Sequence, residues 1–341
     1  MAILIFLLVL FALVLVHEFG HFLVAKKVGM RVDEFGFGFP PKLASFRKGE
    51  TEYSINALPV GGFVRIYGEE LSDEEDTVIG GGQSNNHSRS FSHKPKWAQT
   101  LVLIAGIIAN VLFAWLLFTI AFVHGVPTSV SPEEATGAAE LYIMDIIPES
   151  PAAVADIPAG AVITGLTRGG ETISPRSPEE FRAFIGAFGG EPVVVAYTYN
   201  DAEASVELTP SRGVLEGEPN VVAVGVSLGL AEVRSLPIHR ALVEGLKTTI
   251  AGLRDTIVGI VSLLASAFAL QADLSNVAGP IGIVGLVGDA SALGLSTLLM
   301  FTAFISLNLA VINILPLPAL DGGRVLFLII EKIRRKPVDR K

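Results

Sequence analysis

The 341-residue sequence contains no cysteine. Disulfides, thiolate metal ligands and cysteine nucleophiles are therefore excluded, so that any bound metal must be held by histidine, aspartate or glutamate. Charge is also scarce, because only 17% of the residues are charged whereas 50% are apolar. This composition is typical of a membrane protein. The net charge of -9 carries no basic footprint for nucleic acid, and we expect no nucleic-acid partner.

Three long apolar runs predict transmembrane helices, since about 20 apolar residues are needed to cross a bilayer. They extend from Ala2 to Val24, from Ala98 to Val123 and from Leu295 to Leu315. The third run is followed by Pro316 and Pro318, which cannot continue a regular helix. A cleaved signal peptide is the alternative for the first run, but that run lacks both a basic start and a small-residue cleavage pattern.

A fourth apolar stretch, Thr256 to Leu270, has only 15 residues and follows charged residues, which favours a helix on the membrane surface. The distribution of charge agrees with three spans. Ten Lys and Arg residues lie between the first two runs and seven follow the third, whereas residues 125–236 hold five against 16 Asp and Glu. Because basic loops tend to stay in the cytoplasm, the two basic segments are expected to face the cytoplasm, as are the ends of the first and third runs that adjoin them. Residues 125–236 are expected to lie outside.

The segments between the runs differ in character. Thr51 to Tyr67 has the partial alternation of a β-hairpin, and residues 69–93 resemble a flexible linker whose His87 and His93 are expected to be solvated. Short apolar segments within 128–213 predict a small α+β domain. The predicted organisation is a first transmembrane helix (1–24), a cytoplasmic-side hairpin and linker (25–97), a second transmembrane helix (98–124), the α+β domain (128–213), interfacial amphipathic or re-entrant segments (237–294), a third transmembrane helix (295–323) and a basic cytoplasmic tail (324–341).

The first run contains the pattern H-E-x-x-H as His17, Glu18 and His21. On a helix, positions i and i+4 share a face, about 6 Å apart along the axis, so both imidazoles can reach one zinc ion. Glu18 lies beside that face, where it can activate a zinc-bound water and pass the proton to the leaving amine. Three ionisable groups within a span cost several kcal/mol unless they have a partner, and a metal is the natural one, so a chance occurrence is disfavoured.

A third protein ligand is still required, and Asp321 is the acidic residue at the end of the third run. Both runs cross in the same direction, so Asp321 and the histidines would lie at similar depth. The alternative is that Asp321 caps a following helix that begins at Gly322. Glu331, among basic residues, is expected to be surface charge.

Asn308 and Asn313 lie in the third run, where buried amides must be hydrogen-bonded. They either join neighbouring helices or bind the backbone of an extended substrate and polarise its scissile carbonyl.

Together these motifs resemble the site-2 protease family of intramembrane zinc metalloproteases, in its bacterial RseP-like branch of regulator-of-sigma-E proteases. The resemblance covers most of the chain. It rests on HEFGH at 17–21, Gly36-Phe37-Gly38, PVGGFVRI within 51–67, Asn110, Val277 to Ile281, and the stretch from Asn308 through Asn313 to Asp321-Gly322-Gly323.

The resemblance implies a polytopic α-helical membrane protein with a membrane-reentrant β-hairpin and one inserted, extracytoplasmic PDZ-like domain. It implies a Zn²⁺-dependent metalloendopeptidase of the bacterial inner membrane that cuts single-span proteins in the bilayer after an upstream site-1-type protease has trimmed them. Anti-sigma factors and signal-peptide remnants are the implied substrates. Residues 51–67 would bind the unwound substrate as an added strand, and Asn308 and Asn313 would contact it.

The sequence departs from the family pattern in three places. It ends at Lys341, where members usually continue into another membrane helix, which implies a truncated, incomplete or unusual member. The segment from Ala105 to Asn110 lacks the usual proline after glycine. In the PDZ-like stretch, Asp156 and Ala161 replace the usual glycine and aspartate, so that a steric filter is at least as well supported as peptide binding.

Two other classes of function are open. The first is a catalytically silent membrane adaptor that binds clients through the PDZ-like domain, which the intact H-E-x-x-H pattern and Asp321 argue against. The second is a zinc transporter, which would need a continuous polar path across the spans, and the third run offers little toward such a path apart from Asn308 and Asn313.

Overall fold

The computed structural model describes residues 1–69, 87–131, 139–187, 190–199, 202–215, 217–218, 220–269 and 279–334. Most of the predicted linker and the end of the predicted basic tail lie outside these residues. The chain forms two compact units. The first comprises residues 1–121, 238–291 and 297–341, and the second comprises residues 122–237 and 292–296.

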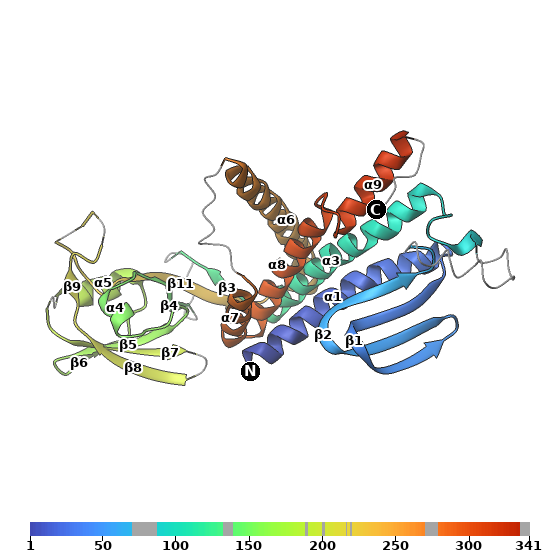
Figure 1. Ribbon diagram of the computed structural model, residues 1–341. Helices are drawn as coiled ribbons and strands as arrows, with labels where there is room; N and C mark the ends of the chain where they lie inside the picture. Colours follow the sequence, from blue (N-terminus) through green and yellow to red (C-terminus); the bar gives the residue numbers. More distant parts are fainter. Residues whose placement is uncertain are drawn as a thin grey trace. The chain divides into compact units, whose positions relative to one another are not determined.

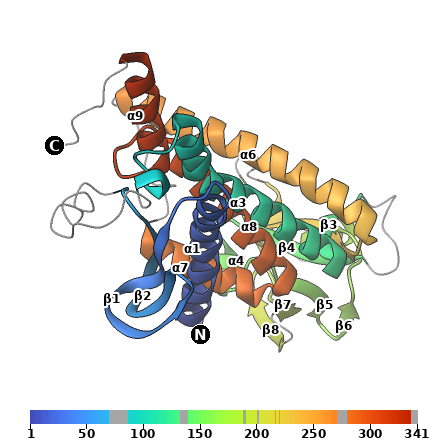
Figure 2. The ribbon, with the colours of Figure 1, turned by 90° about the vertical axis from the view of Figure 1, so that its right-hand side faces the viewer.

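The first unit is built on long helices whose apolar residues pack against one another. Within it α1, α3 and α8 lie side by side (Figures 1 and 2), and Leu13 of α1 is buried together with Val287 of α7. Partly buried side chains of α3 and α8 complete this cluster. The helices are α1 (Ala2–Lys27), the short 3-10 helix η2 (His87–Arg89), α3 (Lys96–His124), α6 (Ile238–Phe268), α7 (Pro280–Ala292), α8 (Leu295–Ile314) and α9 (Asp321–Arg334).

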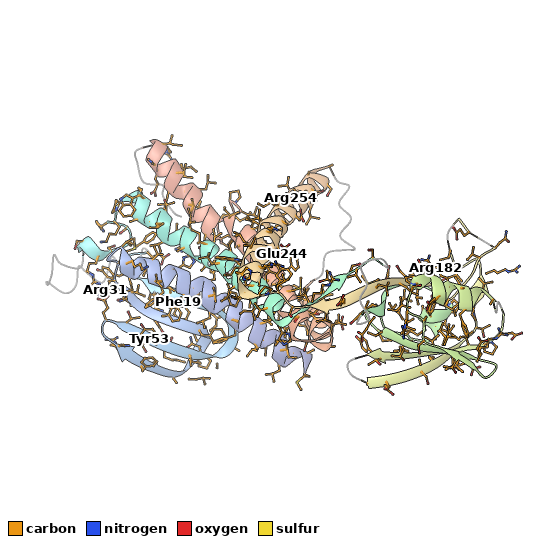
Figure 3. The ribbon with its side chains drawn as sticks, turned by 180° about the vertical axis from the view of Figure 1, so that it is seen from behind. Phe19, Arg31, Tyr53, Arg182, Glu244 and Arg254 are labelled. Atoms are coloured by element: carbon orange, nitrogen blue, oxygen red, sulfur yellow. The ribbon has the colours of Figure 1, made fainter. Side chains whose placement is uncertain are left out.

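Four of the described helices, α1, α3, α6 and α8, are long and apolar enough to cross a membrane. α6 is the unexpected one, because the sequence predicted only a short surface helix in this region. Its hydroxyl-bearing and charged residues, such as Glu244 and Arg254, interrupt the apolar ones (Figure 3). The side chain of Trp115 on α3 donates a hydrogen bond to the Leu242 carbonyl at 2.9 Å, which ties α6 to α3. The position of α6 on the membrane surface remains a prediction.

The end of the chain differs from the predicted third span and tail. The predicted helix of residues 295–323 is in fact two helices, since α8 ends at Ile314, before Pro316 and Pro318. Residues 321–334, mostly assigned to the tail, form α9. Glu331 of α9 is buried rather than on the surface, and Lys96 pairs with it at 2.6 Å.

The two strands β1 (Val32–Lys48) and β2 (Thr51–Ile66) form a bent antiparallel hairpin beside α1 (Figure 1). The first part of β1 pairs with both ends of β2, since Phe37 lies opposite Gly62 and opposite Ile55. The end of β2 is therefore an outer edge of this small sheet. No other described strand pairs with that edge.

The turn of the hairpin is tied to the end of α1 by charge. Glu50 accepts hydrogen bonds from Arg89 at 2.7 Å and from Lys26 at 2.6 Å. The hydrogen bonds from Arg89 and Lys26 lower the pKa of Glu50 to about 2. The far part of the hairpin instead exposes apolar side chains, including Phe39, Leu43 and Phe46.

The second unit is an α+β domain. Its sheet has the strand order β3-β11-β4-β5-β7-β8, with β6 beside β5. Phe181, Phe184 and Ile185 of α5 are buried in its core with the strand residues Leu166 and Val193. The elements are β3 (Val126–Ser129), β4 (Glu140–Ile146), α4 (Pro151–Val154), β5 (Val162–Arg168), β6 (Glu171–Ile173), α5 (Pro178–Ala187), β7 (Val193–Tyr199), β8 (Ala202–Leu208), β9 (Ser211–Arg212), β10 (Val222–Ala223) and β11 (Val226–Arg234).

The second unit extends beyond the predicted bounds of 128–213. The reason is β11, which lies between β3 and β4 in the sheet although it follows the predicted end. A strand added from a distant part of the sequence cannot be assigned to a sheet by local alternation alone.

Candidate metal centre

The helices α1 and α3 approach closely at two glycines. A Cβ at Gly20 of α1 would lie 2.5 Å from the Ala105 carbonyl oxygen of α3. A Cβ at Gly106 of α3 would lie 2.4 Å from Nε2 of His21 and 2.8 Å from Cε1 of His17. Such separations are too short for a real side chain, so the backbone of α3 can lie against the two imidazoles only because these positions are glycine.

Three potential ligand atoms converge at this contact. Nε2 of His17 and Nε2 of His21 lie 3.2 Å apart, and Oδ2 of Asp321 lies 3.2 Å from the first and 3.3 Å from the second. His17 and His21 are buried. Oδ2 of Asp321 is also buried and has no hydrogen-bond partner among the described residues.

These separations fit a tetrahedral zinc site. Ligands about 2.05 Å from a tetrahedral zinc ion are separated by about 3.3 Å, close to the spacing of the three atoms. The set comprises two imidazoles and a carboxylate, the donor chemistry of catalytic zinc sites that keep a fourth position open. The orphaned oxygen of Asp321 would gain its missing partner in the metal.

Both imidazoles are oriented through their other nitrogen. Nδ1–H of His21 donates to the Val102 carbonyl at 2.8 Å, which leaves Nε2 free to bind a metal. Nδ1 of His17 lies 3.2 Å from Nδ2 of Asn110, whose Oδ1 is buried without a partner among the described residues. As placed, a nitrogen of Asn110 faces a nitrogen of His17 while the amide oxygen has no described partner. Exchanging the amide oxygen and nitrogen would correct both, because Oδ1 would then accept a hydrogen bond from Nδ1–H of His17.

Asp321 is brought to the histidines by a tight corner between α8 and α9. A Cβ at Gly322 would lie 2.2 Å from the Ile314 carbonyl oxygen, and one at Gly323 would lie 2.0 Å from the Leu317 carbonyl oxygen. The absence of side chains at the two glycines thus allows the first turn of α9 to pack closely against the end of α8 and the residues that follow it. Asp321 is the first residue of α9 rather than a residue before it.

Glu18 lies beside this cluster in a cavity of about 650 Å³, which the histidines and Asp321 also line. The hairpin forms another wall of the cavity with residues 61–66 of β2. Gly62 leaves little space beside Glu18, because a Cβ at this position would lie 3.1 Å from Cγ of Glu18.

The two asparagines of α8 differ. Asn313 is buried and lines the cavity. Asn308 is exposed, does not line the cavity, and donates its amide to the Phe304 carbonyl of its own helix at 2.9 Å. The cavity therefore supports a substrate contact for Asn313 and gives none for Asn308.

Several residues of the site were not expected from the sequence. They are Gly106, Gly62, and the ion pair of Glu69 and Arg324, whose two members line the cavity. Gly62 and Gly106 lie in stretches that carry the family resemblance, but the local sequence does not show what a distant segment places against them.

Comparison with known proteins agrees with the class defined by this fold and site, a membrane-embedded metalloprotease. Peptidase family M50 matches residues 5–341. A protein of Clostridium perfringens named as a zinc metalloprotease is 34% identical over 331 residues, which cover 97% of this chain and 88% of the relative. The zinc metalloprotease RasP of Geobacillus kaustophilus is 29% identical, with coverage of 98% and 90%.

The chain belongs to peptidase family M50, the site-2 protease family. It is a multi-pass intramembrane zinc metalloprotease. A solved PDZ domain of an SdrC-like protein from Listeria monocytogenes is 22% identical and matches 28% of this chain and 90% of that domain, with a TM-score of 0.23. That score is too low to assign the fold of the second unit.

Proposed function

We propose that His17, His21 and Asp321 hold the zinc ion and that Glu18 is the general base of peptide hydrolysis. When bound, zinc supplies a Lewis acid that activates water and polarises a carbonyl. Glu18 accepts a proton from the attacking water and donates it to the leaving amine, as a carboxylate in reach of both can do. The observation that carries this proposal is the convergence of the three ligand atoms within one cavity that Glu18 also lines.

The substrate enters the cavity as an extended segment. A helical peptide hides its carbonyls in backbone hydrogen bonds, so a transmembrane substrate must unwind before it is cut. The outer edge of β2, which no other described strand joins, offers backbone groups that can satisfy the unwound segment as an added strand. Residues 61–66 of that edge line the cavity beside Glu18, which supports this binding mode. Asn313 contacts the same segment.

The proposed substrates are single-span membrane proteins, such as anti-sigma factors or signal-peptide remnants, that an upstream protease has already shortened. The cavity is lined by the helices and the hairpin, with no room for a folded domain. The second unit is proposed to be a PDZ-like domain on the extracytoplasmic side that filters substrates by size. The cavity is proposed to open toward the cytoplasmic side, and the exposed apolar part of the hairpin to enter the membrane as a reentrant element.

The test is cleavage of a fluorescent single-span substrate by the purified protein in detergent, with and without 1,10-phenanthroline. Glu18→Gln keeps the shape of the side chain but removes the base, and we expect at least a hundredfold loss of cleavage with zinc still bound at one per chain. Lys332→Gln, an exposed change on α9, is the control and should cleave normally. Retained cleavage in Glu18→Gln would contradict the role of Glu18. A wild-type protein that binds zinc and client but cleaves nothing would favour an adaptor.

A further inference from the structure

An ion pair connects the hairpin to the helix that carries Asp321. Nη1 of Arg324 on α9 lies 2.5 Å from Oε1 of Glu69, which follows β2. Only 11% of the Glu69 side chain is exposed. Both residues line the cavity of Glu18, but the proposed chemistry uses neither of them.

Backbone hydrogen bonds join each partner to a different wall of the cavity. The Glu69 amide donates to the Ile66 carbonyl at 3.1 Å, directly at the end of β2, and the neighbouring Tyr67 amide donates to Arg31 at 2.9 Å. On the other side, the Arg324 amide donates to Leu320 at 3.2 Å, in the first turn of α9. A movement of the β2 edge relative to Asp321 would therefore stretch the ion pair.

Because Glu69 is buried, losing its ion pair with Arg324 would be costly. Burial raises the pKa of Glu69 above its ordinary value, and the charge and hydrogen bond of Arg324 oppose that rise. A buried carboxylate without a partner is costly, and a charge-assisted hydrogen bond to a guanidinium is directional. Arg324 therefore holds the Glu69 carboxylate in a defined direction.

We propose that Glu69 and Arg324 are a positioning pair that fixes the edge of β2 relative to α9, and thereby determines which substrate peptide bond lies at the metal centre. The inference rests on the proposed binding of substrate along the β2 edge. A paired strand takes its register from the strand that it joins, so a shift of that edge moves the whole substrate past Glu18. A displacement of about 1 Å is enough to reduce a rate by about a hundredfold.

The activity test compares Glu69→Gln, Arg324→Gln and the exchanged double variant Glu69→Arg/Arg324→Glu, with Lys332→Gln as control. We expect each single variant to lose about tenfold or more in kcat/KM and to cut at additional neighbouring bonds, as measured by mass spectrometry of the products. The zinc content should stay at one per chain. The exchanged pair should recover most of the rate and cut at the original bond. A purely structural role would lower the amount of folded protein without changing the position of the cut.

A second measurement does not depend on cleavage. Because the chain has no cysteine, Arg65→Cys on β2 and Ile333→Cys on α9 provide two unique spin-label sites, and both side chains are exposed. The distance distribution between the labels should be narrow in the parent, broader when Glu69→Gln is added, and narrow again in the exchanged pair.

The outcomes separate this inference from the proposed function. Unchanged distances and an unchanged cut in the single variants would overturn the positioning role while the protease mechanism stands. A wild-type protein that cleaves nothing would overturn the proposed mechanism, and the label distances would then still decide whether the pair fixes the edge of β2.

Discussion

The backbone of α3 at Gly106 lies so close to His21 that a single methyl group there would be 2.4 Å from Nε2. We therefore expect Gly106→Ala to displace the imidazole and to reduce zinc binding by at least tenfold, with loss of cleavage. Gly259→Ala on α6 is the matched control, because no described atom outside its own stretch of helical backbone lies within 4 Å of the added methyl group. Zinc per chain, measured by elemental analysis after dialysis, should be reduced in Gly106→Ala and unchanged in Gly259→Ala. Full zinc content in Gly106→Ala would contradict this prediction, because it would show that α1 and α3 can move apart without weakening zinc binding.

Asn110 is expected to orient His17 through Oδ1. Asn110→Leu removes the acceptor and should weaken zinc binding about 10- to 100-fold, as loss of such supporting partners does. Asn110→Asp keeps an oxygen in the same place and should retain more zinc than Asn110→Leu. Titration with a competing chelator measures both. Equal affinity in the two variants would contradict an acceptor role for Asn110.

Substitutions of the two asparagines of α8 are expected to have different effects on cleavage kinetics. Asn313 is buried against the cavity, whereas Asn308 is exposed and bonded to its own helix. We expect Asn313→Ala to lower kcat/KM by about tenfold or more and Asn308→Ala to change it by less than about threefold. Zinc content should be normal in both. A large loss in Asn308→Ala would place a substrate contact outside the cavity.

Glu50 predicts a dependence of stability on pH. Its pKa is about 2 in the folded protein against an ordinary value of 4.5, because Arg89 and Lys26 favour the carboxylate. A lowered pKa contributes stability that is complete above about pH 4.5 and is lost as the pH falls toward about 2.

Glu50→Gln should therefore destabilise the protein near neutral pH by about 1 kcal/mol or less, since the partners are partly exposed. The difference in melting temperature between wild type and variant should shrink as the pH falls below about 4.5. Glu203→Gln, which is exposed in β8, serves as the control. A difference that stays constant down to the lowest pH tolerated would contradict the ion pair.

Much of the site followed from local sequence because its spacing is a property of the helix. His17 and His21 lie on one face of α1 wherever that helix is placed, and Glu18 lies beside them. The identity of Asp321 also followed, because an acidic residue beside an apolar run is rare enough to stand out.

The second unit shows what local sequence patterns could not predict. Its inner strands could be expected from apolar alternation, but β11 could not be assigned to the sheet, because its partners β3 and β4 precede it by a long stretch of chain. The end of α8 shows the reverse case, because Pro316 and Pro318 marked in the sequence where the apolar run 295–315 must stop, and α8 ends at Ile314.

The sequence by itself determined the class of this protein: a membrane-embedded zinc protease with H-E-x-x-H in the apolar run 2–24 and an aspartate after the apolar run 295–315. Only the tertiary structure decided that Gly106 lies against His21, that Asn313 rather than Asn308 lines the cavity, and that Glu69 pairs with Arg324. The reason is physical. Ligand type and helical spacing are local, whereas each of these contacts depends on the packing of segments that are far apart in the chain.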